Sequence, residues 1–136
     1  MKNEELYKDY LLRAEGRLKA LDTLFNESLW ADVVRESQEV VELALKGLLR
    51  AMHIEVPRIH DVSAVLEQNK LKLPEAIMQN LEKISDISQQ LRRDRELAFY
   101  GSEDLTPHSF YKRKHAEIAR DSARFIVEVS KNGAGL

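Results

Sequence analysis

Hydrophobic residues recur every three or four positions along most of this chain, which is the spacing of amphipathic helices. One such stretch covers residues 6–25, and a second, over 30–52, is the most regular. Charged residues occupy the opposite face of the second stretch, where Glu42 and Lys46 are spaced to pair. Pro57 interrupts the pattern before a shorter apolar stretch at 59–66. These patterns predict two long helices followed by a short one.

Residues typical of helix ends separate these stretches. Ser28 precedes the second stretch, and we expect its hydroxyl group to cap that helix. Pro74 suits the first turn of a fourth helix, which carries an apolar stripe over 77–98. Thr106 and Pro107 predict the start of a last helix.

The last helix is expected to end at residues 132–133, where an asparagine and a glycine follow the apolar pattern. No stretch shows the alternating pattern of a strand. We therefore predict an all-α fold, an antiparallel up-and-down helical bundle of four long helices plus one short helix.

Composition limits the class of protein. The 136 residues suit a single domain over 1–136, and 43% hydrophobic with 32% charged residues is typical of a soluble helical protein. The absence of cysteine excludes a disulfide framework and a thiolate metal site. No apolar run approaches membrane-spanning length, so we expect a cytoplasmic protein with no membrane partner. A net charge of −2 argues against binding to duplex DNA.

Arg95 is the first candidate site residue, because it continues the apolar stripe of the fourth helix four places after Leu91. A guanidinium on a buried stripe is costly unless it is paired or faces a polar cleft. We therefore expect Arg95 to face a ligand or an interface. Tyr100 could donate a hydrogen bond to a phosphate or stack on a base. Alternatively, Phe99 and Tyr100 close the end of the bundle.

Arg92 and His115 are further candidates for ligand binding. Arg92 belongs to a charged cluster at 92–96, whose simpler interpretation is a solvated face on which Arg92 pairs with Glu96. His115 lies on the apolar stripe of the last helix, where a histidine that only packs in the core is the simpler interpretation. The four histidines form two pairs spaced seven apart, too far to share a metal. We expect neither a metal nor a cofactor.

The order of several motifs adds a family resemblance. Residues 42–49 are close to a Glu-x-Ala-x-Lys-x-x-Leu run, His60 follows a loop marked by a proline, and the fourth helix ends in the segment 95–101. With these motifs in this order, the chain resembles the HEPN family (higher eukaryotes and prokaryotes nucleotide-binding). The resemblance covers nearly the whole chain and implies a single HEPN-like helical domain over 1–136.

The resemblance also implies function. Such domains are often dimeric and occur singly or beside a minimal nucleotidyltransferase, in two-gene toxin–antitoxin modules. Many are metal-independent ribonucleases with an arginine followed, after four to six residues, by a histidine. Arg95 matches the arginine, but Tyr100, Gly101 and Ser102 stand where the histidine is expected. A neutral-pH base is therefore missing.

We accordingly expect a binding module rather than an enzyme. Its ligand is predicted to be a nucleotide, a phosphate of single-stranded RNA, or a partner nucleotidyltransferase, and its fourth and last helices to form a homodimer. The expected ligand-binding residues are Arg95, Tyr100, Arg92 and His115. One alternative is a weak metal-independent ribonuclease with Arg-x4-Tyr, in which Tyr100 or His115 replaces the histidine. Another is a purely structural helical interaction protein.

Overall fold

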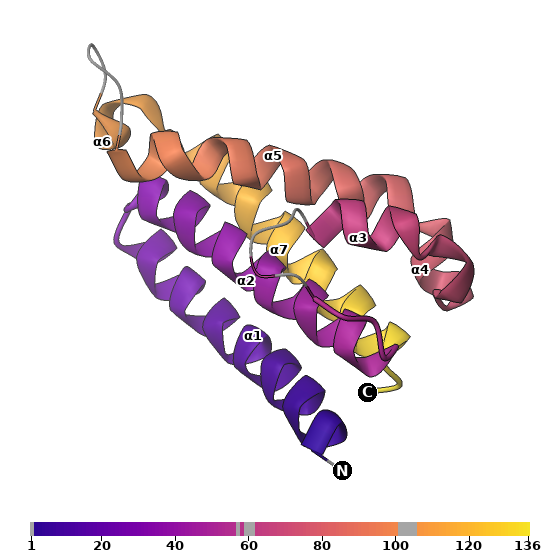
Figure 1. Cartoon of the computed structure of the whole chain (residues 1–136). Helices are drawn as coiled ribbons and strands as arrows, with labels where there is room; N and C mark the ends of the chain where they lie inside the picture. Colours follow the sequence, from indigo (N-terminus) through magenta and orange to yellow (C-terminus); the bar gives the residue numbers. More distant parts are fainter. Residues whose placement is uncertain (1, 57, 59–61, 101–105) are drawn as a thin grey trace.

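The computed structural model describes residues 2–56, 58, 62–100 and 106–136, and for 96–100 it describes the backbone alone. Figure 1 shows the arrangement of the helices. In chain order they are α1 (Lys2–Asn26), α2 (Trp30–Ala51), α3 (Val62–Gln68), the short 3₁₀ helix η1 (Lys70–Lys72), α4 (Glu75–Gln79), α5 (Leu81–Tyr100), α6 (Pro107–Phe110) and α7 (Arg113–Gly133).

Helix α2 lies at the centre of the bundle, where it contacts α1, α5 and α7. Figure 1 shows α1, α2 and α7 running side by side, with α5 crossing over α2 and α7. The short helices α3 and α4 pack beside the first half of α5, and α6 lies at its other end. The predicted all-α fold is confirmed, and its four long helices are α1, α2, α5 and α7.

The core follows the apolar stripe of α2. Leu45, Leu48 and Leu49 on this helix have no exposed surface, and neither does Leu11 of α1. Gly47 sets the distance between α1 and α2, because an added Cβ atom would lie 2.9 Å from the Cγ of Leu11. The two helix backbones can approach this closely only without a side chain at position 47.

One predicted helix start and the continuity of one predicted helix are wrong. Ser28 does not cap α2, because the residue at the cap position is Leu29 and it makes no side-chain cap bond. Ser28 instead has a φ of 61°, in the left-handed region that suits a tight turn. The predicted fourth helix is interrupted at Asn80, whose side-chain amide donates to the carbonyl of Ala76 at 2.7 Å. Such side-chain bonds compete with the backbone ladder of a helix.

The last predicted helix is divided as well. Thr106 caps its start as expected, accepting a hydrogen bond from the backbone N–H of Ser109 at 3.2 Å. The helix ends at Phe110, however, because Tyr111 and Lys112 have extended backbones. Helix α7 begins at Arg113 and ends at Gly133 as predicted. The break allows the Tyr111 side chain, 2% exposed, to enter the core.

Candidate functional site

Arg95 continues the apolar stripe of α5 in the sequence, but its side chain does not enter the core. Its side chain is 47% exposed, although Leu91, one turn earlier on α5, is buried. The Arg95 Nη2 atom lies 2.7 Å from Oε1 of Glu39 on α2. A long arginine side chain can leave an apolar face and place its charge in water. The position of Arg95 on the apolar stripe therefore does not mean that its guanidinium group is buried.

Arg92 repeats this contact one turn earlier on α5. Its Nη2 lies 3.1 Å from Oε1 of Glu42, so it has a partner on α2. The side chain of Glu96, the expected partner, lies outside the described atoms. The contact with Arg92 also gives Glu42 a partner other than the expected Lys46. The two arginines and the two glutamates are each spaced three apart, which places each pair on one face of its helix. Two parallel ion pairs therefore connect α5 with α2.

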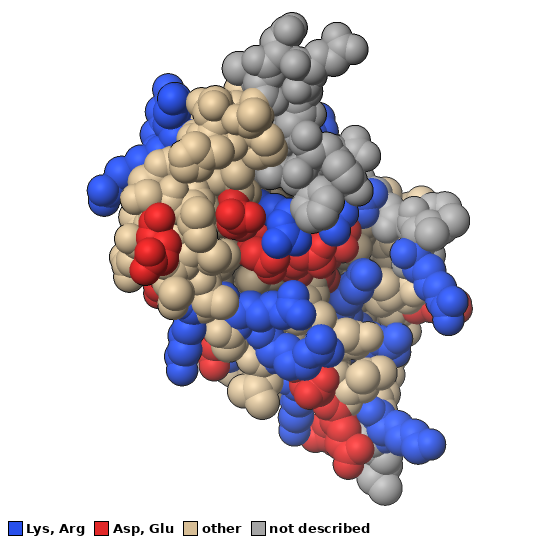
Figure 2. Space-filling model, turned by 90° about the vertical axis from the view of Figure 1, so that its left-hand side faces the viewer, with Lys and Arg blue, Asp and Glu red and all other residues tan. Residues whose placement is uncertain are grey.

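These ion pairs border a hollow of about 450 Å³, which we name the arginine cleft. It is lined by Gln38, Glu42, Arg92, Arg93 and Arg95. Figure 2 views the molecule from the end where α1 turns into α2, and acidic and basic side chains gather there next to each other.

Among the described side chains that line the arginine cleft, basic groups outnumber acidic ones. Arg93 donates to the neutral side-chain oxygen of Gln90 at 2.8 Å rather than to a carboxylate. Gln38 is only 4% exposed, and its Oε1 atom has no hydrogen-bond partner. This unpaired Gln38 oxygen is an acceptor, so it would take a donor of a ligand rather than its phosphate. Of the lining side chains that the structure describes, three are guanidinium groups and one is a carboxylate, that of Glu42. Such a site suits an anion.

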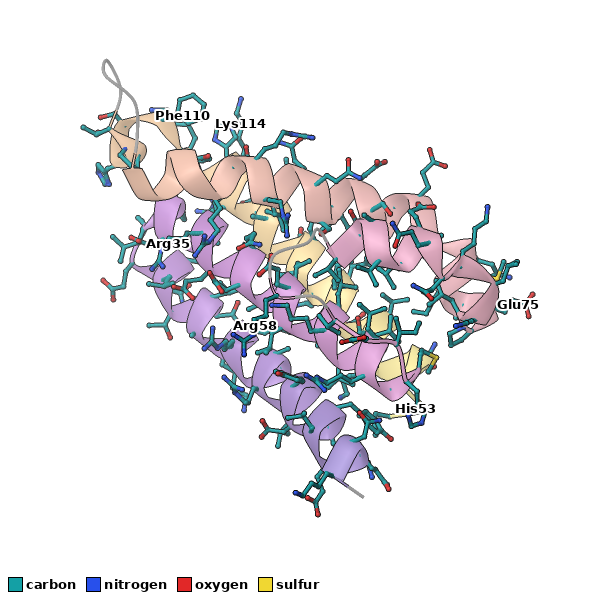
Figure 3. The ribbon with its side chains drawn as sticks, viewed as in Figure 1. Arg35, His53, Arg58, Glu75, Phe110 and Lys114 are labelled. Carbon is teal, nitrogen blue, oxygen red and sulfur yellow. The ribbon has the colours of Figure 1, made fainter. Side chains whose placement is uncertain are left out.

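His115 lies in a different hollow from Arg95. This hollow of about 530 Å³, the α5–α7 groove, includes Ile87, Leu91, Tyr111, His115 and Ile118 in its lining. The Nδ1 atom of His115 accepts the backbone N–H of Lys112 at 2.9 Å, completing a capping box at the start of α7. Its ring also stacks on Phe110 with centroids 5.9 Å apart. Figure 3 shows Phe110 at this end of the molecule. The described contacts of His115 therefore stabilise the first turn of α7.

Tyr111 connects the two hollows. Its hydroxyl group donates to the backbone carbonyl of Asp94 at 3.0 Å. Burial, with a smaller contribution from the Asp94 carboxylate, raises the pKa of Tyr111 to about 12, so the phenol remains a donor at neutral pH. Arg93, next to Asp94, lines both the arginine cleft and the α5–α7 groove. The two hollows thus share a wall.

Several predicted features lie outside the described residues. Tyr100 is the last residue of α5, but its side chain is not among the described atoms, and neither is that of Phe99. Gly101, Ser102 and His60 also lie outside the described part of the chain. Within the described residues, no group of three or more histidine or acidic side chains could hold a metal ion. None of the described helices is long and apolar enough to cross a membrane.

Sequence reasoning missed Gln38 and Glu39 as parts of the site. The sequence does contain a signal for this contact: two acidic residues spaced three apart on α2 match two basic residues spaced three apart on α5. Helical spacing alone could not show that these two helices are neighbours.

The fold and the site define an all-α bundle with an arginine-lined cleft between its central helix and the helix that crosses it. The family model of the HEPN domain matches residues 7–133, and the chain therefore belongs to the HEPN domain family. Neither curated proteins nor solved structures provide a significant match.

Proposed function

We propose that this protein binds phosphate groups of a nucleotide or of single-stranded RNA in the arginine cleft. The observation that carries the proposal is the convergence of Arg92, Arg93 and Arg95 on one hollow. The planar guanidinium group of arginine matches a phosphate with two parallel hydrogen bonds. Membership of the HEPN domain family supports a nucleotide- or RNA-related role.

The existing ion pairs leave the arginines available for a ligand. The side chains of Arg92 and Arg95 are 40% and 47% exposed, and those of Glu42 and Glu39 are 25% and 31% exposed. An ion pair that remains open to water contributes about 1 kcal/mol. A phosphate can therefore replace Glu39 and Glu42 as their partner at little cost. Among the described residues Arg93 forms no ion pair, and its hydrogen bond goes to the neutral Gln90.

A binding module is favoured over the ribonuclease alternative. A ribonuclease that used His115 would need this ring near Arg95, whereas His115 lines the α5–α7 groove. Its Nδ1 atom is also engaged by the N–H of Lys112. The assignment of Tyr100 as a second ligand-binding residue beside Arg95 remains part of the proposal.

Titration of the isotopically labelled protein with AMP, ATP and a short single-stranded RNA, followed by nuclear magnetic resonance, tests this function. We expect shifts at Gln38, Arg92 and Arg95, and an affinity about tenfold weaker in Arg95→Ala, because a charge-assisted hydrogen bond is lost. Arg13→Ala is the matched control: Arg13 is 50% exposed and pairs with Asp9. Equal affinities in Arg95→Ala and the wild type would contradict the proposal.

We also propose a homodimer formed through the α5–α7 groove. Ile118 is 66% exposed and lines this mostly apolar groove together with Ile87 and Leu91, so it adds to an apolar surface that a second copy can cover. Around a two-fold axis, Ile118 of each copy can enter the groove of the other, since such interfaces are self-complementary. We expect Ile118→Glu to shift the sedimentation of a dimer to that of a monomer. A wild-type protein that sediments as a monomer at high concentration would refute the dimer.

A minimal nucleotidyltransferase in a two-gene toxin–antitoxin system is the proposed protein partner, an expectation that rests on the family. Co-expression with the product of an adjacent nucleotidyltransferase gene, followed by size-exclusion chromatography, tests it. Elution of the two proteins as separate species would contradict the partnership. A stable complex together with no response to nucleotides or RNA would instead support the alternative of a structural interaction protein.

A further inference from the structure

The outer face of α2 continues beyond the arginine cleft, and the charge of its side chains changes from negative to positive. Glu39, Glu42, Lys46 and Arg50 follow one another at spacings of three or four residues, so they share this face of the helix. The two carboxylates lie on the side of α5, where they pair with Arg92 and Arg95. Past Glu42, this face carries only the two basic side chains.

A separate hollow of about 200 Å³ lies at the basic end of this face, and we name it the basic hollow. It is lined by Tyr10, Lys46, Arg50, Val56 and Arg58. Figure 3 shows Arg58 over the middle of α2. The hollow thus brings together cations from α2 and from the segment that follows it, beside an aromatic side chain of α1.

The cations of the basic hollow have no acidic partner in the described part of the chain. None of the described side chains that line it is acidic. Among the residues that the structure describes, neither Lys46 nor Arg58 has an ion pair, and the Arg50 guanidinium carbon lies 5.6 Å from the centre of the Tyr10 ring. Like charges held together repel, so an anion between them relieves repulsion as well as forming new bonds. The Tyr10 hydroxyl group adds a neutral donor.

We infer that the basic hollow is a second phosphate-binding subsite, and that it forms with the arginine cleft one track along α2 for the backbone of single-stranded RNA. This inference rests on the proposed function of the arginine cleft. Glu42 and Arg50 are eight residues apart, which places the two hollows about 12 Å apart along the helix. A single phosphate group cannot occupy both hollows, whereas two phosphates of an oligonucleotide that are separated by an intervening phosphate can.

The track therefore selects a chain of nucleotides over a mononucleotide. Protein grooves that hold single strands combine basic side chains along the backbone with aromatic rings. The arginine cleft supplies three guanidinium groups, and the basic hollow supplies three further cations and Tyr10. Each added phosphate contact strengthens binding and increases its dependence on salt.

Fluorescence anisotropy with a labelled single-stranded RNA dodecamer tests the subsite, with AMP binding measured in parallel by magnetic resonance. The test variant is Lys46→Glu/Arg58→Glu, and Lys70→Glu/Lys72→Glu is the control with the same change in net charge. Lys70 and Lys72 are exposed on η1 and line neither hollow. Thermal unfolding followed by circular dichroism verifies that each variant folds.

We expect the test variant to bind the dodecamer at least about tenfold more weakly than the control, and its salt dependence to fall by about 0.7 per lost contact. AMP binding should be equal in the test and control variants. If AMP binds but both variants hold the dodecamer equally well, the second subsite is refuted. If neither AMP nor RNA binds the wild type, the proposed function fails as well. A glutamate-rich peptide that binds the basic hollow while RNA does not would also refute the inference.

Discussion

Leu45→Ala is expected to lower the free energy of unfolding by about 2–5 kcal/mol. Leu45 lies in the middle of α2 with no exposed surface, and α2 contacts α1, α5 and α7. The truncated side chain loses its apolar burial and leaves a cavity that the rigid surrounding helices cannot close. Because small domains are stable by only about 5–15 kcal/mol, this loss is a large part of the total.

Denaturation in urea, followed by circular dichroism, measures this effect. Leu71→Ala is the matched control, because Leu71 is 87% exposed and its truncation should change the unfolding free energy by no more than about 0.5 kcal/mol. Equal unfolding midpoints for the two variants would show that α2 is not the centre of the core.

Glu39→Gln/Glu42→Gln is expected to raise the affinity of the arginine cleft for AMP by about tenfold. Each glutamine keeps the shape of the side chain but removes a negative charge that competes with phosphate for Arg95 or Arg92. A unit charge about 6 Å from the phosphate repels it by roughly 0.7 kcal/mol in water, which amounts to about threefold for each residue. The unfolding free energy should fall by less than about 1 kcal/mol per pair.

Isothermal titration calorimetry with AMP measures this change. The control, Glu4→Gln/Asp9→Asn, alters net charge equally by removing the acidic partners of two exposed ion pairs on α1. An increase in both double variants would indicate a general effect of net charge. An affinity that falls in Glu39→Gln/Glu42→Gln would mean that the carboxylates contact the ligand rather than compete with it.

The apolar periodicity located the long helices well because each of them buries one continuous stripe. The expected stretches at 6–25 and 30–52 correspond closely to α1 and α2. The interruptions at Asn80 and at Tyr111 were missed, since they depend on a side-chain bond to the preceding turn and on a contact with α5. Neither contact can be predicted from the pattern of hydrophobic and polar positions.

In the candidate site, too, the sequence predicted what depends on position along one helix and missed what depends on contacts between helices. The sequence identified Arg92 and Arg95, because they stand in a charged cluster beside an apolar stripe. It did not identify Gln38 and Glu39, and it paired Glu42 with Lys46 rather than with Arg92. These residues of α2 precede the arginines by 50 residues or more, and they approach them only when α5 crosses α2. His115 shared a stripe with core residues, and the structure placed it in a separate hollow.

The bond between Tyr111 and the Asp94 carbonyl has a thermodynamic consequence. It fixes the backbone between Arg93 and Arg95 to the residue that separates α6 from α7, and Tyr111 also lines the groove proposed for dimerisation. For a dimer that perturbs this bond, ligand binding and self-association are linked equilibria. Phosphate then changes the dimer dissociation constant by the same factor by which dimerisation changes the affinity for phosphate, so each process reports on the other.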